Sequence, residues 1–156
     1  MFGKSLGEYL RLQAWVLVAI VVVFAARWGL SSAGMPAARW ASVTWVLVLG
    51  AVYYGIVVQT TGFGSYRQLY PLNLIQSLLA ESLVAVAIVV GLLTDTHNIF
   101  TVPEFVQGPL QGQDGRSWAH AFAHILLPGA IVLPLFGWLI GSIVMFVTKK
   151  VTPGRS

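Results

Sequence analysis

The chain contains no cysteine, and its 156 residues include only nine Lys or Arg, five Asp or Glu and three His. Without cysteine there is no disulfide, no thiolate metal site, no cysteine nucleophile and no iron–sulfur cluster. The charged residues make up only 9% of the chain, far below the charge content of a soluble domain. Any chemistry must therefore come from a few histidines, carboxylates, amides and hydroxyls.

Several sequence patterns of known sites are also missing. The chain has no glycine-rich phosphate loop, no nucleophile elbow, no kinase signature and no pair of carboxylates at a short, fixed spacing. The net charge is +4, but the basic residues lie beside apolar runs and form no dense cluster. The sequence therefore favours neither catalysis of the kind found in soluble enzymes nor binding of nucleic acid.

The composition instead indicates an integral membrane protein. Hydrophobic residues make up 57% of the chain, and the mean hydropathy is +0.80. Four apolar runs, at about 12–30, 41–61, 72–94 and 118–148, are each long enough to cross the hydrocarbon core of a bilayer. The first run also resembles a secretory signal, but we expect it to be retained as a helix. The sequence predicts one all-α domain over residues 1–156, with four antiparallel transmembrane helices in a bundle.

The basic residues predict how this bundle is oriented. One side of the membrane would hold six of them and the other side three, which places both termini in the cytoplasm. The first set is Lys4, Arg11, Arg67, Lys149, Lys150 and Arg155, and the second is Arg27, Arg39 and Arg116. Arg27, beside Trp28, is interpreted as a headgroup anchor. The long loop 95–117 between the third and fourth helices would then be non-cytoplasmic.

Glu81 is the one acidic residue inside an apolar run, and a carboxylate there should face the interior of the bundle. It lies nine residues after Leu72, about 14 Å along a helix. The same depth on the second helix falls beside Tyr53 and Tyr54, and on the fourth helix within the spacing Gly137-x-x-x-Gly141. The sequence therefore predicts a polar cluster at this depth.

On its own helix, Glu81 continues a polar stripe. Asn73, Ser77 and Glu81 are four residues apart and share one face, with Gln76 close to that face. A stripe of this kind suits a path for protons or a polar headgroup that ends at a titratable group. It also suits a neutral glutamic acid that hydrogen-bonds between helices. Both interpretations remain open at this stage.

A second, weaker candidate is the pair His120 and His124. Their spacing of four residues places both imidazoles on one face of a helix, as in some metal sites. His97 or one of the loop carboxylates, Asp95, Glu104 and Asp114, would have to complete a zinc, copper or iron site. Alternatively, the two histidines hydrogen-bond to loop carbonyls. Because the pair and Glu81 should lie at different depths, we treat them as separate sites.

Three functions fit these observations. The sequence favours a non-catalytic subunit or scaffold of a membrane assembly, with other membrane subunits, a second copy of the chain and the lipid bilayer as its contacts. Gly137 and Gly141 would then mediate close helix packing. The second function is a carrier or binding protein for protons or a small amphipathic ligand, with its cavity at Glu81. The third is a metal-dependent membrane enzyme that uses His120 and His124.

Overall fold

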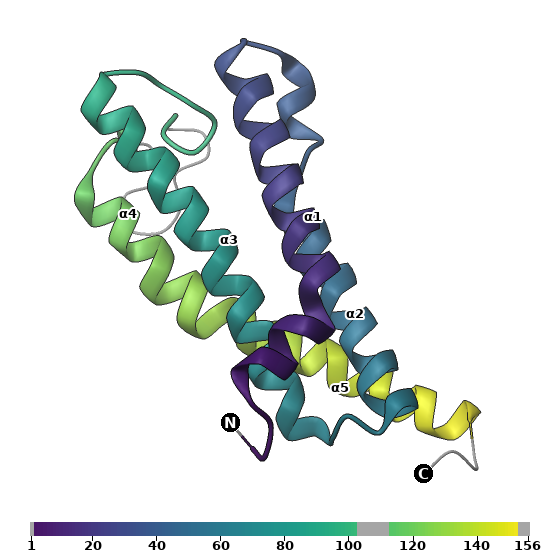
Figure 1. The fold of residues 1–156 in the computed structure, drawn as a ribbon. Helices are drawn as coiled ribbons and strands as arrows, with labels where there is room; N and C mark the ends of the chain where they lie inside the picture. The colour runs from purple at the N-terminus through teal and green to yellow at the C-terminus, as the bar shows by residue number, and fades with distance from the viewer. Residues whose placement is uncertain (1, 103–112, 153–156) are drawn as a thin grey trace.

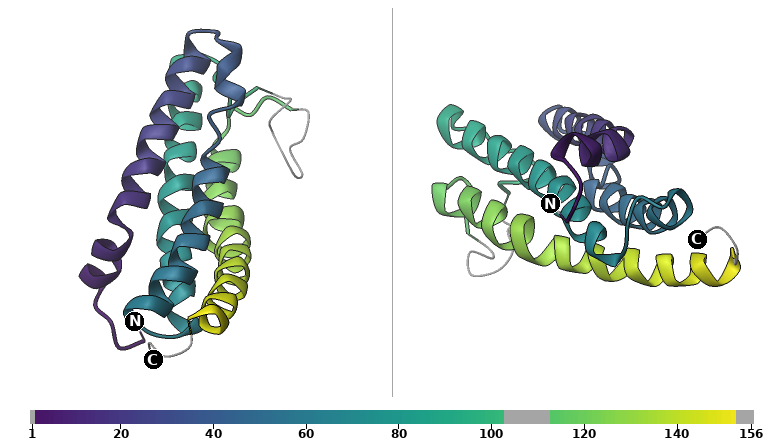
Figure 2. Two further views of the ribbon diagram at one scale, coloured as in Figure 1. Left: turned by 90° about the vertical axis from the view of Figure 1, so that its right-hand side faces the viewer. Right: turned by 60° about the horizontal axis from the view of Figure 1, so that its bottom comes forward.

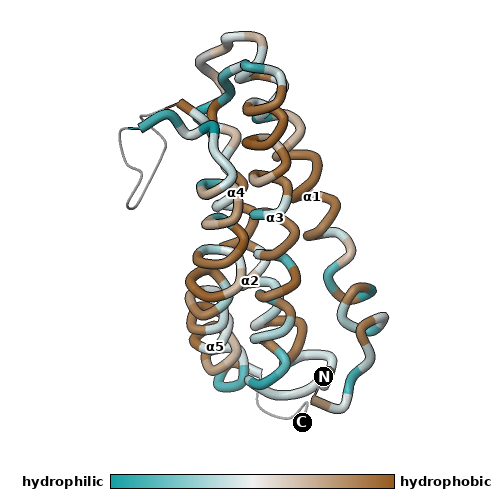
Figure 3. Tube along the Cα trace, turned by 90° about the vertical axis from the view of Figure 1, so that its left-hand side faces the viewer, coloured by the Kyte–Doolittle hydropathy of each residue, from teal (hydrophilic) through white to brown (hydrophobic). Residues whose placement is uncertain are grey.

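The computed structural model describes residues 2–102 and 113–152, and these residues form helices and connecting loops without any strand. Four helical spans are long and apolar enough to cross a membrane: Leu6–Ser32, Ala37–Thr61, Tyr66–Thr94 and Trp118–Val151. The prediction of an all-α protein with four such spans is therefore confirmed. Figure 3 shows apolar residues along most of the helices and polar residues mainly at their ends and in the loops.

The helices follow one another along the chain in the order shown in Figure 1. They are α1 (Leu6–Ser32), the 3-10 helix η1 (Pro36–Arg39), α2 (Val43–Thr61), α3 (Tyr66–Thr94), α4 (Trp118–His124), the π-helical segment η4 (Ile125–Val132) and α5 (Leu133–Val151). The last three elements are consecutive and form the fourth span.

The third helix begins earlier than the sequence analysis predicts. It starts at Tyr66 instead of Leu72, because Ser65 and Gln68 form a capping box. The side chain of each residue bonds the backbone of the other, which satisfies N–H groups that a helix start leaves unpaired. Pro71 therefore lies inside α3 and does not start it. The extra turns move Glu81 to the middle of the helix.

The fourth span is irregular around its two prolines. Pro128 lies within η4, and Pro134 lies in the first turn of α5. Proline has no N–H to donate, and a π-helical segment rearranges the hydrogen bonds around it, so that the N–H of Leu133 bonds the carbonyl of Pro128. The irregular segment follows directly after His124.

Helix α3 contacts each of the other membrane-length helices. Toward one end, α5 packs on both α2 and α3, and the start of α1 and the end of α5 lie at that end (Figure 2). Toward the other end, the pair α1 and α2 diverges from the pair α3 and α4 (Figure 1). The site described below lies between these two pairs.

Glycines permit the close packing of α5. A Cβ atom built on Gly55 of α2 would lie 2.5 Å from the carbonyl oxygen of Gly141, and one on Gly137 would lie within contact distance of Asn73 of α3. The Gly137-x-x-x-Gly141 spacing thus faces α2 and α3 of the same chain. Asn73, rather than Glu81, is the polar residue opposite Gly137.

Candidate functional site

Glu81 of α3 is bonded to His124, the last residue of α4. Oε2 of Glu81 and Nδ1 of His124 are 2.6 Å apart, and the Glu81 side chain is only 12% exposed. Gly129 of η4 packs against Glu81, since a Cβ atom there would lie 3.1 Å from the Cβ of Glu81. The expectation that Glu81 and the histidine pair occupy different depths is wrong, because the fourth span is shifted relative to α3 and brings them into one site.

His120 extends this contact to the loop that precedes α4. Its Nε2 atom lies 3.1 Å from Nε2 of His124, and its Nδ1 atom lies 2.8 Å from the carbonyl oxygen of Gly115. The side chains of Glu81, His124 and His120 thus form a continuous hydrogen-bonded row, which we call the Glu–His–His row. The row runs from the middle of α3 to the loop.

Hydrogen-bonding rules determine how many protons this row holds. The Gly115 carbonyl only accepts, so Nδ1 of His120 carries a proton. The contact between the two imidazoles and the contact with Glu81 each need one further proton, because two lone pairs would repel at these distances. With these protons the two imidazoles and the carboxylate have a summed charge of zero, wherever the shared protons reside. A neutral group is much less costly to bury than a charged one.

The Glu–His–His row borders a cavity between the two pairs of helices. Its volume is about 440 Å³, within the usual range of small-molecule sites. Glu81 and His124 line it from α3 and α4, and Val84 of α3 and Leu47 of α2 add apolar surface. Phe100, from the loop after α3, also lines it. The cavity therefore combines an apolar wall with a few polar groups.

Arg27 of α1 brings a positive charge to this cavity. Its guanidinium lies 5.3 Å from the ring centre of Phe100, and its Nε atom is buried without a hydrogen-bond partner. From the sequence, Arg27 is predicted to be a headgroup anchor. The structure instead turns its side chain inward, where Phe100 stacks on Phe24 and supports the guanidinium by a cation–π contact.

The other polar residues predicted around Glu81 form a separate network. The Tyr54 hydroxyl lies 3.1 Å from the side-chain oxygens of both Gln76 and Gln13. Gln76 donates to the Asn73 side chain and to the carbonyl of Leu47. Tyr54, Gln76 and Asn73 therefore do not bond Glu81, and they join α1, α2 and α3 to one another.

Two further predicted residues also have other surroundings. The Tyr53 hydroxyl donates to the carbonyl of Leu12. The Ser77 hydroxyl is buried and has no hydrogen-bond partner. Of the six residues that the sequence analysis assigns to a ligand or proton site, only Glu81 lines the cavity. Asn73, Gln76 and Ser77 precede the cavity on α3, and Asn73 lies against Gly137 of α5. The hydroxyls of Tyr53 and Tyr54 on α2 bond residues of α1 and α3 outside the cavity.

The structure brings together two of the three histidines considered as metal ligands. His97 lines a different hollow, near Arg39 and Asn98, and Glu104 lies outside the described residues. Within residues 2–102 and 113–152, no group of three or more His, Asp or Glu side chains is arranged to hold a metal ion. The metal site therefore stays a hypothesis that rests on the pair His120 and His124.

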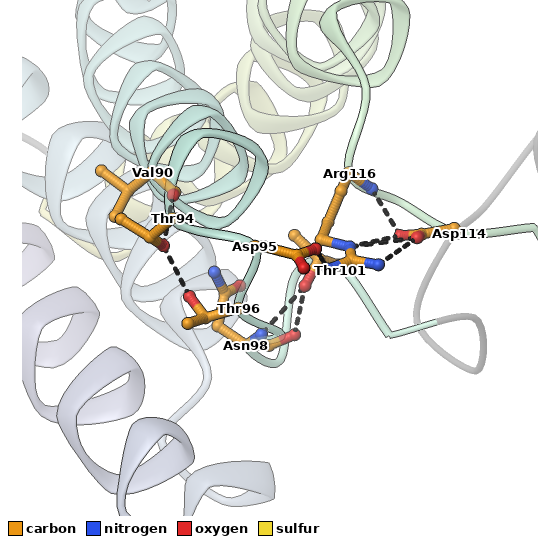
Figure 4. Close-up of polar contacts among 8 residues, drawn as sticks. All are labelled: Val90, Thr94, Asp95, Thr96, Asn98, Thr101, Asp114 and Arg116. Atoms are coloured by element: carbon orange, nitrogen blue, oxygen red, sulfur yellow. Dashed lines mark hydrogen bonds and ion pairs between the residues drawn. The ribbon is translucent and has the colours of Figure 1, made fainter.

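Asp95 and Asp114 bond Arg116, which lies between them (Figure 4). Arg116 donates to both carboxylate oxygens of Asp114 and to Asp95, the residue that caps α3. Next to Arg116 in the chain, the N–H of Gly115 donates to the carbonyl of Thr101. We call this arrangement the Arg116 clamp. It holds the two described ends of the loop together and fixes the carbonyl that His120 binds.

The stability of the Arg116 clamp should depend on pH only under acidic conditions. Hydrogen bonds from Arg116 lower the pKa of Asp114 to about 2, from an ordinary value near 3.9. A lowered pKa in the folded state stabilises the clamp above about pH 4, and this contribution is lost as the pH falls toward 2. We expect Arg116→Gln to speed amide hydrogen exchange in residues 113–117 several-fold at neutral pH. Arg39→Gln, which removes a charge elsewhere at the same end, should leave it unchanged, and equal effects of the two would contradict the clamp.

Four residues of the cavity and of the polar network were not predicted from the sequence to belong to a site: Arg27, Ser42, Thr44 and Gln13. Arg27 and Gln13 both lie within an apolar span, where a polar side chain is costly and usually faces the bundle. That signal was present for both. Ser42 and Thr44 carry no such signal, because hydroxyl residues are common where a helix starts.

Comparisons of the chain with protein-family models, with curated proteins and with solved structures found no match. The geometry of the cavity and of the Glu–His–His row is therefore the basis for a functional assignment.

Proposed function

We propose that this protein binds a small amphipathic molecule in the cavity beside Glu81, and that it does so within the membrane. The observation that carries the proposal is the cavity of about 440 Å³, which Arg27, Glu81 and His124 border and apolar side chains enclose. Small-molecule sites typically combine an apolar lining with a few placed polar groups. A molecule with a polar head and an apolar body matches both parts of this lining.

The proposal places the four spans across the bilayer as an antiparallel bundle. Both termini would be cytoplasmic, because Lys and Arg are more numerous at that end. The cavity then lies in the half of the bundle toward the non-cytoplasmic loops, since Arg27 is near the end of α1 and Ser42 precedes α2. A ligand dissolved in the membrane would reach it between the diverging helix pairs.

The binding function explains features that a scaffold does not require. A non-catalytic subunit, which the low density of reactive groups favours, needs neither a cavity nor an arginine whose buried Nε atom lacks a partner. A titratable row next to the cavity also suits a protein that binds protons together with its ligand. Partner chains are compatible with this function and are not required by it.

Filling the cavity should remove the bound amphiphile. Val84 lines the cavity. Val86, two residues further along α3, does not line it, and its side chain is 53% exposed. We expect wild-type protein to retain amphiphiles that are enriched over the lipids of the source membrane, as measured by mass spectrometry of organic extracts. Val84→Trp should lower this enrichment several-fold, because the indole occupies the space of the ligand.

Val86→Trp is the matched control, since it adds the same side chain to the same helix on the outward face. It should retain the enrichment of the wild type. Equal enrichment in the two variants, or no enriched amphiphile in the wild type, would contradict a ligand-binding cavity.

A further inference from the structure

The cavity has one unbalanced charge. Three of the side chains that line it, Arg27, Glu81 and His124, are charged or titratable. Glu81 and His124 belong to the Glu–His–His row, whose summed charge is zero by the proton count above. Among the described residues, no carboxylate forms an ion pair with Arg27. The positive charge of the guanidinium is therefore not compensated by any residue that the structure describes.

Further hydrogen-bond donors lie on the α2 side of the same cavity. Ser42 and Thr44, whose side chains carry hydroxyls, are among the residues that line it, and Ser42 is the residue that precedes α2. The Ser42 side chain makes no capping bond to the helix. The first turn of the 19-residue α2 thus has unpaired N–H groups and the positive end of the helix dipole at the cavity. Arg27 and the start of α2 favour the same kind of ligand atom.

The remainder of the lining is apolar. Leu47, Val84 and Leu133 come from α2, α3 and α5, and they lie on the lining together with the polar groups already described. A free inorganic anion would leave these side chains without a partner. A molecule with an anionic head and a hydrocarbon body would fill both regions.

We propose that the cavity selects amphiphiles with an anionic headgroup, a carboxylate or a phosphate, and that Arg27 is the residue that binds this headgroup. This inference rests on the proposed function, because it names the ligand class of the same cavity. Arg27 supplies a planar fork of N–H donors that matches the oxygens of either headgroup. Ser42 and Thr44, which line the same cavity, carry hydroxyls that can donate to such oxygens.

Titration of three probes into protein held in phosphatidylcholine nanodiscs tests this. The probes are dodecyl phosphate, dodecanol as its uncharged analogue, and inorganic phosphate as the anion without a chain. Wild-type protein should bind dodecyl phosphate at least about tenfold more tightly than dodecanol, a difference of about 1.4 kcal/mol. Inorganic phosphate should neither bind measurably nor compete with dodecyl phosphate.

Arg27→Gln should abolish the preference for dodecyl phosphate and leave the affinity for dodecanol within about twofold of the wild type, which also shows that the variant is folded. Arg39→Gln is the matched control, because Arg39 lies at the same end of the molecule and does not line this cavity. It should keep the full preference of the wild type.

The outcomes separate this inference from the proposed function. Equal binding of dodecyl phosphate and dodecanol, both lost in Val84→Trp, would overturn the anionic class and keep the binding cavity. Competition by inorganic phosphate would overturn the requirement for a hydrocarbon chain. Loss of both ligands in Arg27→Gln would overturn the headgroup role of Arg27, and binding of both that Val84→Trp does not change would contradict the cavity itself.

Discussion

Replacing Glu81 by alanine is expected to destabilise the protein by about 1–3 kcal/mol. The Glu81 side chain is 12% exposed, and its carboxyl group bonds Nδ1 of His124 at 2.6 Å. Its removal leaves a ring nitrogen of the partly buried His124 without its partner and disturbs the contact between His124 and His120. Unfolding of the purified protein in detergent micelles, followed by tryptophan fluorescence, measures this loss.

Glu81→Gln should behave differently, because an amide N–H can donate to Nδ1 of His124 and keep the row neutral. We expect a loss of about 1 kcal/mol or less for this variant. A double-mutant cycle with His124→Ala provides the control for direct contact. The combined loss in Glu81→Ala/His124→Ala should be smaller than the sum of the single losses, since neither variant can break a bond that the other has already removed. Strictly additive losses would contradict the Glu81–His124 contact.

The helices could be predicted because long apolar runs have few alternatives in a chain with so little charge. Their ends were predicted less well, and the cause is local. The start of α3 depends on reciprocal bonds between Ser65 and Gln68, and these overcome the usual preference of Pro71 for a helix start. The π-helical segment around Pro128 likewise changes the register of the fourth span. The pattern of apolar residues in the sequence does not reveal this change.

The site was predicted in its parts and not in its assembly. Glu81 was recognised from the sequence as a carboxylate in an apolar run, and His120 and His124 were recognised by their spacing of four residues. Depth was counted from helix ends, however, and an error of a few residues at each end is enough to pair Glu81 with the tyrosines of α2 instead of His124. The contact also depends on Gly129, whose missing side chain lets η4 approach Glu81. Spacing along a single helix carries no information about such a contact between helices.

Gly55→Ala should be the most disruptive alanine substitution at the interface of α2 and α5. The new Cβ atom would lie 2.5 Å from the carbonyl oxygen of Gly141 and 2.8 Å from the Cβ of Val144. Neither atom is the end of a flexible side chain, so the two helices have to move apart. Overpacking of this kind typically costs about 1–3 kcal/mol. The separation would also loosen α5 along its contact with α3, on which the register of His124 with Glu81 depends.

Gly29→Ala is the control for the substitution itself. Gly29 is exposed in α1, and a Cβ atom there has no neighbour within 4 Å. Alanine is the better helix former by about 1 kcal/mol, so this variant should be at least as stable as the wild type in the same detergent unfolding assay. The same gain applies at Gly55 and is outweighed only if the backbones of α2 and α5 are in contact there. A Gly55→Ala variant as stable as Gly29→Ala would therefore show that the two helices do not approach as closely as the fold requires.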